Sequence, residues 1–91
     1  MVEAKSIVVT GRVQGGGFRY FTKILADRLG VTGVVWNASD GSVRIEAQGD
    51  EVAMKDFVNG VSVSPSPYGR VDSVTSEAID VSPERRIFKA I

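Results

Sequence analysis

The pattern of apolar and polar positions along this chain alternates between two periods, which predict strands and helices. Residues 43–48 alternate between apolar and polar side chains, as in a strand with one buried face. Two other segments repeat apolar residues at helical spacing. The predicted strands are Lys5–Thr10, Gly33–Asn37, Val43–Gln48 and Val71–Ile79, with a short final strand over Arg86–Ile91. An imperfect period in the fourth of these predicts a bulge near Asp72–Ser73.

The two helices are predicted from apolar stripes and their end signals. The first covers Tyr20–Leu29, with Gly30 placed to end it. Asp50 is suited to cap the start of the second. The residues expected to face the core are Phe21, Ile24, Leu25 and Leu29 in the first helix, and Met54, Phe57, Val58 and Val61 in the second.

The element order β-α-β-β-α-β predicts a ferredoxin-like α+β fold. This split β-α-β sandwich places two helices on one face of an antiparallel sheet. A length of 91 residues fits a single domain over residues 1–91. Because the fold hosts many unrelated activities, it does not by itself choose a function.

Composition excludes several classes of function. The 11 basic and 11 acidic residues balance, which disfavours a non-specific nucleic-acid binder. The chain has neither cysteine nor histidine, so a disulfide framework, a thiolate nucleophile and a Ser–His dyad are excluded, and a zinc site is disfavoured. No apolar run is long enough to span a bilayer, and no secretory signal is evident. We expect a cytoplasmic monomer that binds neither nucleic acid nor membrane.

The segment Gly11–Arg19, GRVQGGGFR, carries the strongest chemical signal. Its three adjacent glycines join a predicted strand to a predicted helix, where bare backbone N–H groups can converge on an anion. Arg19 adds a guanidinium suited to phosphate. The segment matches neither a Walker loop nor a G-x-G-x-x-G fingerprint. Two interpretations remain: a phosphate cradle, or a flexible glycine-rich turn beside a solvated arginine.

Asn37 is the second candidate residue. It ends the strand Gly33–Asn37, just before a hairpin signal at Asp40-Gly41. An asparagine here is explained either by turn geometry or by a side-chain amide that holds a water molecule near the cradle.

These two segments together resemble the acylphosphatase family. The stretch Gly11–Tyr20 is similar to the family's first signature. The stretch Gly33–Asn37, followed by Asp40-Gly41 and Val43, is similar to its second. Gln48-Gly49 and Arg70-Val71 extend the resemblance over nearly the whole chain.

The resemblance implies metal-free and cofactor-free hydrolysis of the carboxyl-phosphate bond of acyl phosphates, with release of inorganic phosphate. The implied phosphate-binding residues are Gln14, Gly15, Gly16, Gly17, Phe18 and Arg19, and Arg19 and Asn37 are the implied catalytic residues. By this resemblance, the loop amides and Arg19 bind the phosphoryl oxygens, and Asn37 orients the attacking water.

One position departs from the family's pattern. Gly16 stands where the family usually has valine. A third adjacent glycine predicts a more flexible cradle with altered activity, and a Gly16→Val change is expected to stabilise the loop if the native φ is negative.

Two alternatives are kept in view. A catalytically weak acylphosphatase-like domain would bind phosphate for a regulatory purpose, and such a module also occurs within larger carbamoyl-transfer proteins. An RNA-recognition domain shares the element order, but residues 43–48 carry no aromatic side chain on which bases would stack.

Overall fold

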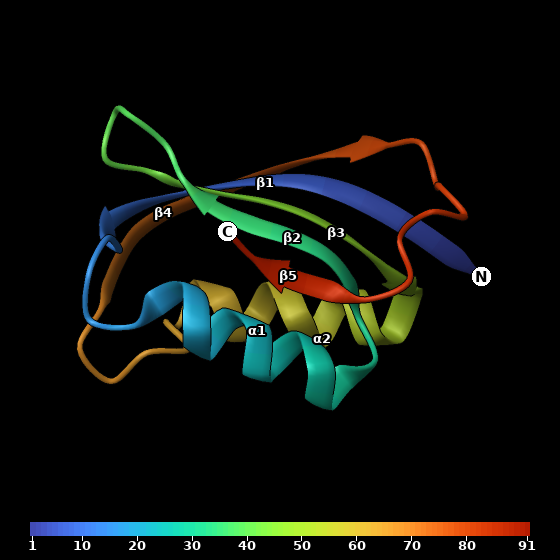
Figure 1. Cartoon of the computed structure of the whole chain (residues 1–91), viewed down its shortest axis with the longest axis horizontal. Helices are drawn as coiled ribbons and strands as arrows, with labels where there is room; N and C mark the ends of the chain where they lie inside the picture. Colours follow the sequence, from blue (N-terminus) through green and yellow to red (C-terminus); the bar gives the residue numbers. More distant parts are fainter.

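The computed structural model describes all residues from Met1 to Ile91 as two helices packed on a five-stranded sheet (Figure 1). This arrangement confirms the ferredoxin-like α+β fold. In chain order the elements are β1 (Val2–Arg12), α1 (Phe18–Leu29), β2 (Thr32–Asn37), β3 (Val43–Asp50), α2 (Glu51–Ser62), β4 (Arg70–Ile79) and β5 (Phe88–Ala90).

The sheet has the strand order β4-β1-β3-β2-β5. Its first four strands pair antiparallel, as predicted, whereas β5 pairs in parallel with β2 at the sheet edge. The short final strand, for which the sequence predicts no orientation, is parallel to β2, because the chain crosses from β4 at the opposite edge before it forms β5. The predicted bulge is confirmed, since the register shifts where Thr10 faces Ser73 and Gly11 faces Val71.

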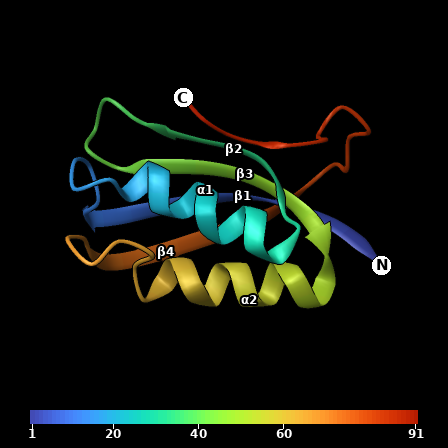
Figure 2. The same ribbon diagram turned by 60° about the horizontal axis from the view of Figure 1, so that its bottom comes forward.

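Both helices cover one face of the sheet, and the core lies between them and the strands (Figure 2). Ile7 and Val9 of the interior strand β1 are completely buried there. The predicted stripe of α2 is confirmed, with Met54, Phe57 and Val61 buried. Asp50 caps this helix as predicted, because its carboxylate accepts the N–H of Val52.

The predicted core face of α1 is partly wrong. Its buried residues are Phe18, Thr22 and Ala26, while Phe21 and Ile24 are only partly buried. The helix begins earlier than predicted, and small side chains face the sheet, which lets the helix approach closely. The buried hydroxyl of Thr22 donates to the Phe18 carbonyl 2.8 Å away, so no polar group is left unpaired.

Three loops gather at one end of the molecule. They are the β1–α1 loop, the β2–β3 hairpin and the α2–β4 loop, drawn in blue, green and orange at the same end in both views (Figures 1 and 2). This end carries the sequence-predicted site residues.

We expect Phe88→Ala to loosen β5. The Phe88 ring is buried and lies 5.9 Å from the Phe57 ring of α2, so it holds the edge strand against the core. Its truncation is expected to lower the free energy of unfolding by about 3–5 kcal/mol. Urea unfolding of this variant, compared with that of the exposed control Lys89→Ala, measures the effect. An equal decrease in the free energy of unfolding in both variants would contradict the anchoring role of the ring.

Candidate active site

The loop between β1 and α1 turns on three glycines with left-handed backbone conformation. The φ angles of Gly15, Gly16 and Gly17 are 82°, 61° and 77°. Side chains are disfavoured at such angles, which explains why the sequence places glycine at each position. Successive peptide groups in turn conformations form a concave surface of N–H groups that suits an anion.

The N–H groups of this loop are left without partners in the chain. Those of Gln14, Gly15, Gly16 and Gly17 donate no hydrogen bond to backbone or side chain, nor do those of Arg19 and Tyr20 in the first turn of α1. Gly17 caps this helix without a side-chain acceptor, and no acidic residue lies in the first turn. The positive end of the helix dipole is therefore free to attract an anion.

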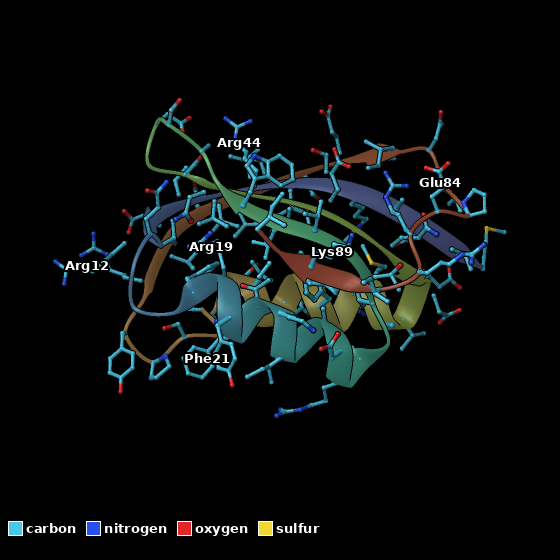
Figure 3. The ribbon with its side chains drawn as sticks, in the orientation of Figure 1. Arg12, Arg19, Phe21, Arg44, Glu84 and Lys89 are labelled. Atoms are coloured by element: carbon cyan, nitrogen blue, oxygen red, sulfur yellow. The ribbon has the colours of Figure 1, made fainter.

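Arg19 lies between the start of α1 and the end of β5, whereas Arg12 points away from the molecule (Figure 3). Nη1 of Arg19 donates to the main-chain oxygen of Ile91. The N–H of Ile91 in turn donates to the Val35 carbonyl of β2, at 3.0 Å. Ile91 thus connects the guanidinium to the strand that carries Asn37, which restricts where Arg19 can lie.

Asn37 is at the last position of β2, opposite Val43 of β3. Alternate residues of a strand share a face, so Asn37 lies on the same side as the buried Val35, toward the helices. Its exposed amide makes no hydrogen bond within the chain and remains available to a ligand or a water.

A cavity of about 270 Å³ brings most of the predicted site residues together. It is lined by Val13, Gly15, Gly17, Phe18, Arg19, Tyr20, Asn37 and Ala90. The predicted residues Gln14 and Gly16 do not line it. Residues from the ends of β1, β2 and β5 and from the start of α1 therefore meet at one hollow.

The side chain of Gln14 performs a different task from anion binding. Its amide nitrogen donates to the carbonyls of Ala38 and Ser42, at 2.7 and 3.0 Å. Both acceptors belong to the β2–β3 turn, so this amide ties the glycine loop to the hairpin that follows Asn37. Only the backbone N–H of Gln14 remains for an anion.

Gly16 faces outward, toward a residue that the sequence analysis missed. Its carbonyl accepts the hydroxyl of Ser66 at 2.8 Å, and a Cβ at this glycine would lie 3.0 Å from the Cβ of Tyr68. Ser66 belongs to the α2–β4 loop, which the sequence presents only as a Ser- and Pro-rich connector. No local pattern marks this contact, because 50 residues separate Ser66 from Gly16.

The β2–β3 turn after Asn37 is held by Asp40. Its carboxylate accepts the hydroxyl of Ser42 at 2.6 Å and the N–H of Ser42 at 2.9 Å, with Arg44 also in contact. The hydroxyl bond, followed by the N–H bond and Arg44, lowers the pKa of Asp40 from its ordinary value of 3.8 to about 2.

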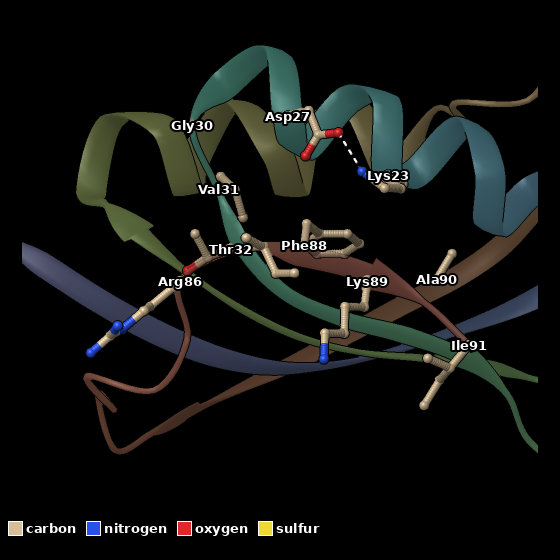
Figure 4. Close-up of a pocket in the computed structure, with 11 residues that line it drawn as sticks. Lys23, Asp27, Gly30, Val31, Thr32, Arg86, Phe88, Lys89, Ala90 and Ile91 are labelled. Carbon is tan, nitrogen blue, oxygen red and sulfur yellow. Dashed lines mark hydrogen bonds and ion pairs between the residues drawn. The ribbon is translucent and has the colours of Figure 1, made fainter.

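No group of three or more His, Cys, Asp or Glu side chains is arranged to hold a metal ion, and no helix is long and apolar enough to cross a membrane. A larger hollow of about 780 Å³ lies between α1 and β5, floored by Phe88 and bordered by the Lys23–Asp27 ion pair (Figure 4). Ala90 is the one residue that lines both this hollow and the cavity of about 270 Å³.

Gly16→Val is expected to destabilise the protein. The stabilising effect expected from the sequence required a negative φ, and the observed angle is +61°. Valine would be strained there and would press on Tyr68, which lowers the free energy of unfolding by about 1–3 kcal/mol. Thermal unfolding tests this, and an unchanged or raised Tm would show that the loop can turn without a left-handed residue at this position.

The Asp40 carboxylate makes the free energy of unfolding depend on pH in the acid range. Because the folded pKa lies below the unfolded value, this carboxylate stabilises the protein fully above about pH 4 and loses that effect as the pH falls through about 2. Asp40→Asn removes the titration, so its Tm is expected to fall less steeply than that of the wild type between those pH values. Parallel Tm curves would contradict the assignment.

Comparisons with known proteins agree with this site. The acylphosphatase family model matches residues 5–90. The acylphosphatase of Latilactobacillus sakei is 51% identical over 83 residues, which cover 90% of this chain and 90% of that protein. That of Enterococcus faecalis is also 51% identical over 83 residues, which cover 91% of each protein. The crystal structure of the acylphosphatase from Bacillus subtilis has 37% identity and a TM-score of 0.90, and the match covers 100% of this chain and 98% of that one. The chain therefore belongs to the acylphosphatase family of enzymes, which act on acyl phosphates.

Proposed function

We propose that this chain hydrolyses the carboxyl-phosphate bond of acyl phosphates by direct attack of water on phosphorus. One observation carries the proposal. Unpaired loop and helix N–H groups, the guanidinium of Arg19 and the free amide of Asn37 converge on one cavity.

In this proposal the backbone of residues 14–18 and the side chain of Arg19 bind the phosphoryl group, and the N–H of Phe18, which donates to the Gly15 carbonyl at 3.4 Å, is the one of these groups that is already paired. The N–H groups meet its oxygens, and the guanidinium neutralises charge on the transferring group. These donors are held before substrate arrives, so little reorganisation is needed during the reaction. The restraint of Arg19 by Ile91 supports this role.

Asn37 positions the attacking water on the phosphorus. The water oxygen forms the new P–O bond, and the carboxylate leaves with the electrons of the bond that breaks. Oxygens of the substrate phosphate accept the proton, since no protein base lines the cavity. An acyl phosphate has a good leaving group, so positioning and charge neutralisation account for most of the catalysis, and no metal or cofactor takes part.

The same proposal assigns one functional domain to residues 1–91, acting as a cytoplasmic monomer. Its partners are small acyl phosphates and inorganic phosphate. The balance of 11 basic and 11 acidic residues supports the absence of nucleic acid among them.

Arg19→Ala and Asn37→Ala are expected to change phosphate binding and turnover in different ways. Loss of Arg19 removes a charge-assisted phosphate contact, so inorganic phosphate binding and hydrolysis of acetyl or benzoyl phosphate both fall at least about 100-fold. Loss of Asn37 lowers kcat by about 10²–10³-fold, while the inhibition constant of phosphate stays within about threefold, because the amide handles water rather than the anion. Steady-state kinetics with phosphate as competitive inhibitor measure both effects, and EDTA is expected to change neither rate.

The outcomes separate the two candidate functions. A wild-type protein that binds phosphate but does not hydrolyse either substrate would be a phosphate-binding regulatory domain. Near-normal turnover in Arg19→Ala would remove this residue from the mechanism. A matched fall of rate and phosphate affinity in Asn37→Ala would make Asn37 a phosphate ligand instead.

A further inference from the structure

We propose that Ser66 is a positioning residue of the phosphate cradle, which directs the N–H of Gly17 into the cavity. The inference rests on the proposed function, because it assigns the cradle to phosphate. Ser66 lies in the α2–β4 loop and does not itself line the cavity.

The hydroxyl of Ser66 is buried and both donates and accepts a hydrogen bond. Ser66 is only 3% exposed, although serine is usually a surface residue. Its Oγ donates to the Gly16 carbonyl at 2.8 Å and accepts the N–H of Tyr68 at 3.2 Å. A buried hydroxyl with both a donor and an acceptor role has one orientation, so it holds the Gly16 carbonyl in a defined direction.

The direction of one carbonyl determines the direction of the next N–H. The Gly16 carbonyl and the Gly17 N–H belong to the same peptide group, and the chain contains no cis peptide bond. In a trans peptide the two groups point in opposite directions. A Gly16 carbonyl turned toward Ser66, which does not line the cavity, therefore turns the Gly17 N–H to the opposite side, toward the cavity that Gly17 lines.

The glycine loop needs this external support. Three adjacent glycines have no side chains to restrict their backbone, and alternative orientations of this peptide would point the N–H away from an anion. Ser66 supplies the restraint from the other side of the loop, and the close approach of Tyr68 to Gly16 limits the remaining space.

Hydrogen bonds within the α2–β4 loop hold Ser66 in place. The Ser64 hydroxyl donates to the Ser66 carbonyl at 2.8 Å, and the Gly69 N–H donates to the same carbonyl at 3.3 Å. Gly69 lies close to the ring of Phe18 at the start of α1, since a Cβ at this glycine would lie 3.2 Å from Cδ2 of the ring. Ser66 is thus fixed relative to the helix N-terminus whose N–H groups complete the cradle.

Ser66→Ala tests the inference through a split between KM and kcat. Without the hydroxyl, fewer molecules hold the competent loop, so KM for acetyl phosphate and the inhibition constant of inorganic phosphate are expected to rise about five- to tenfold. Bound substrate restores the N–H orientation, so kcat stays within about twofold. A merely structural role would lower Tm and the active fraction without raising KM.

Two further variants make the test specific. Ser66→Cys keeps a side chain of similar shape but with a much weaker hydrogen-bond donor. It is therefore expected to raise KM as Ser66→Ala does. If the alanine variant does not fold, this variant still tests the role of the hydroxyl. Ser62→Ala is the matched control, because its hydroxyl bonds within α2 to the Val58 carbonyl and does not reach the cradle. A wild-type KM in either Ser66 variant, or an equal rise in Ser62→Ala, would overturn the inference.

A measurement on the free protein separates this inference from the proposed function. We expect the ¹⁵N heteronuclear NOE of the Gly17 amide to fall in Ser66→Ala relative to the wild type and Ser62→Ala. If the wild type hydrolyses no acyl phosphate, the proposed function fails, while a lowered Gly17 NOE and weaker phosphate binding still support the role of Ser66. An unchanged Gly17 NOE would refute that role.

Discussion

The interior position of β1, between β4 and β3, is the constraint on which the rest of the structure depends. Ile7 and Val9 are completely buried, so the strand cannot slide without exposing its apolar face. Its antiparallel neighbours begin where it ends, because Val9 faces Val43 of β3 and Arg12 faces Arg70 of β4. The glycine loop, the hairpin after Asn37 and the loop that carries Ser66 therefore emerge at the same end.

Rigidity at the site comes from contacts between these loops rather than from the loop sequence. The glycine segment was expected to be flexible because its own residues impose few restraints. Gln14 ties it to the hairpin, and Ser66 holds the Gly16 carbonyl. In this arrangement glycine allows the left-handed turn, and neighbouring loops supply the order that glycine lacks.

The sequence predicts those features whose causes are local. The order of helices and strands along the chain, the stripe of α2 and its cap at Asp50 all follow from short-range patterns, and each is observed. The glycine run with Arg19, and Asn37 at a strand end, suffice to identify the parts of the site. Their meeting at one cavity depends on how β2 pairs with β3 and on where α1 begins.

The features that escape prediction depend on contacts between distant residues. The buried face of α1 is shifted because Thr22 and Ala26 allow a close approach, which apolar periodicity does not reveal. The parallel pairing of β5 with β2 joins residues far apart in the sequence, with Gly33 opposite Phe88. Ser66 has no recognisable motif, since only the folded chain brings it to Gly16.

The same interior position of β1 has a consequence for how the chain acquires its structure. Every sheet partner of β1 lies far along the sequence, with Ala4 paired to Gln48 on one side and to Ile79 on the other. During synthesis on the ribosome, β1 and the glycine segment emerge well before β4 is available. Such non-local pairing slows folding. The strand that positions the cradle is thus made first but gains its full set of neighbours only once Arg70–Ile79 has been added.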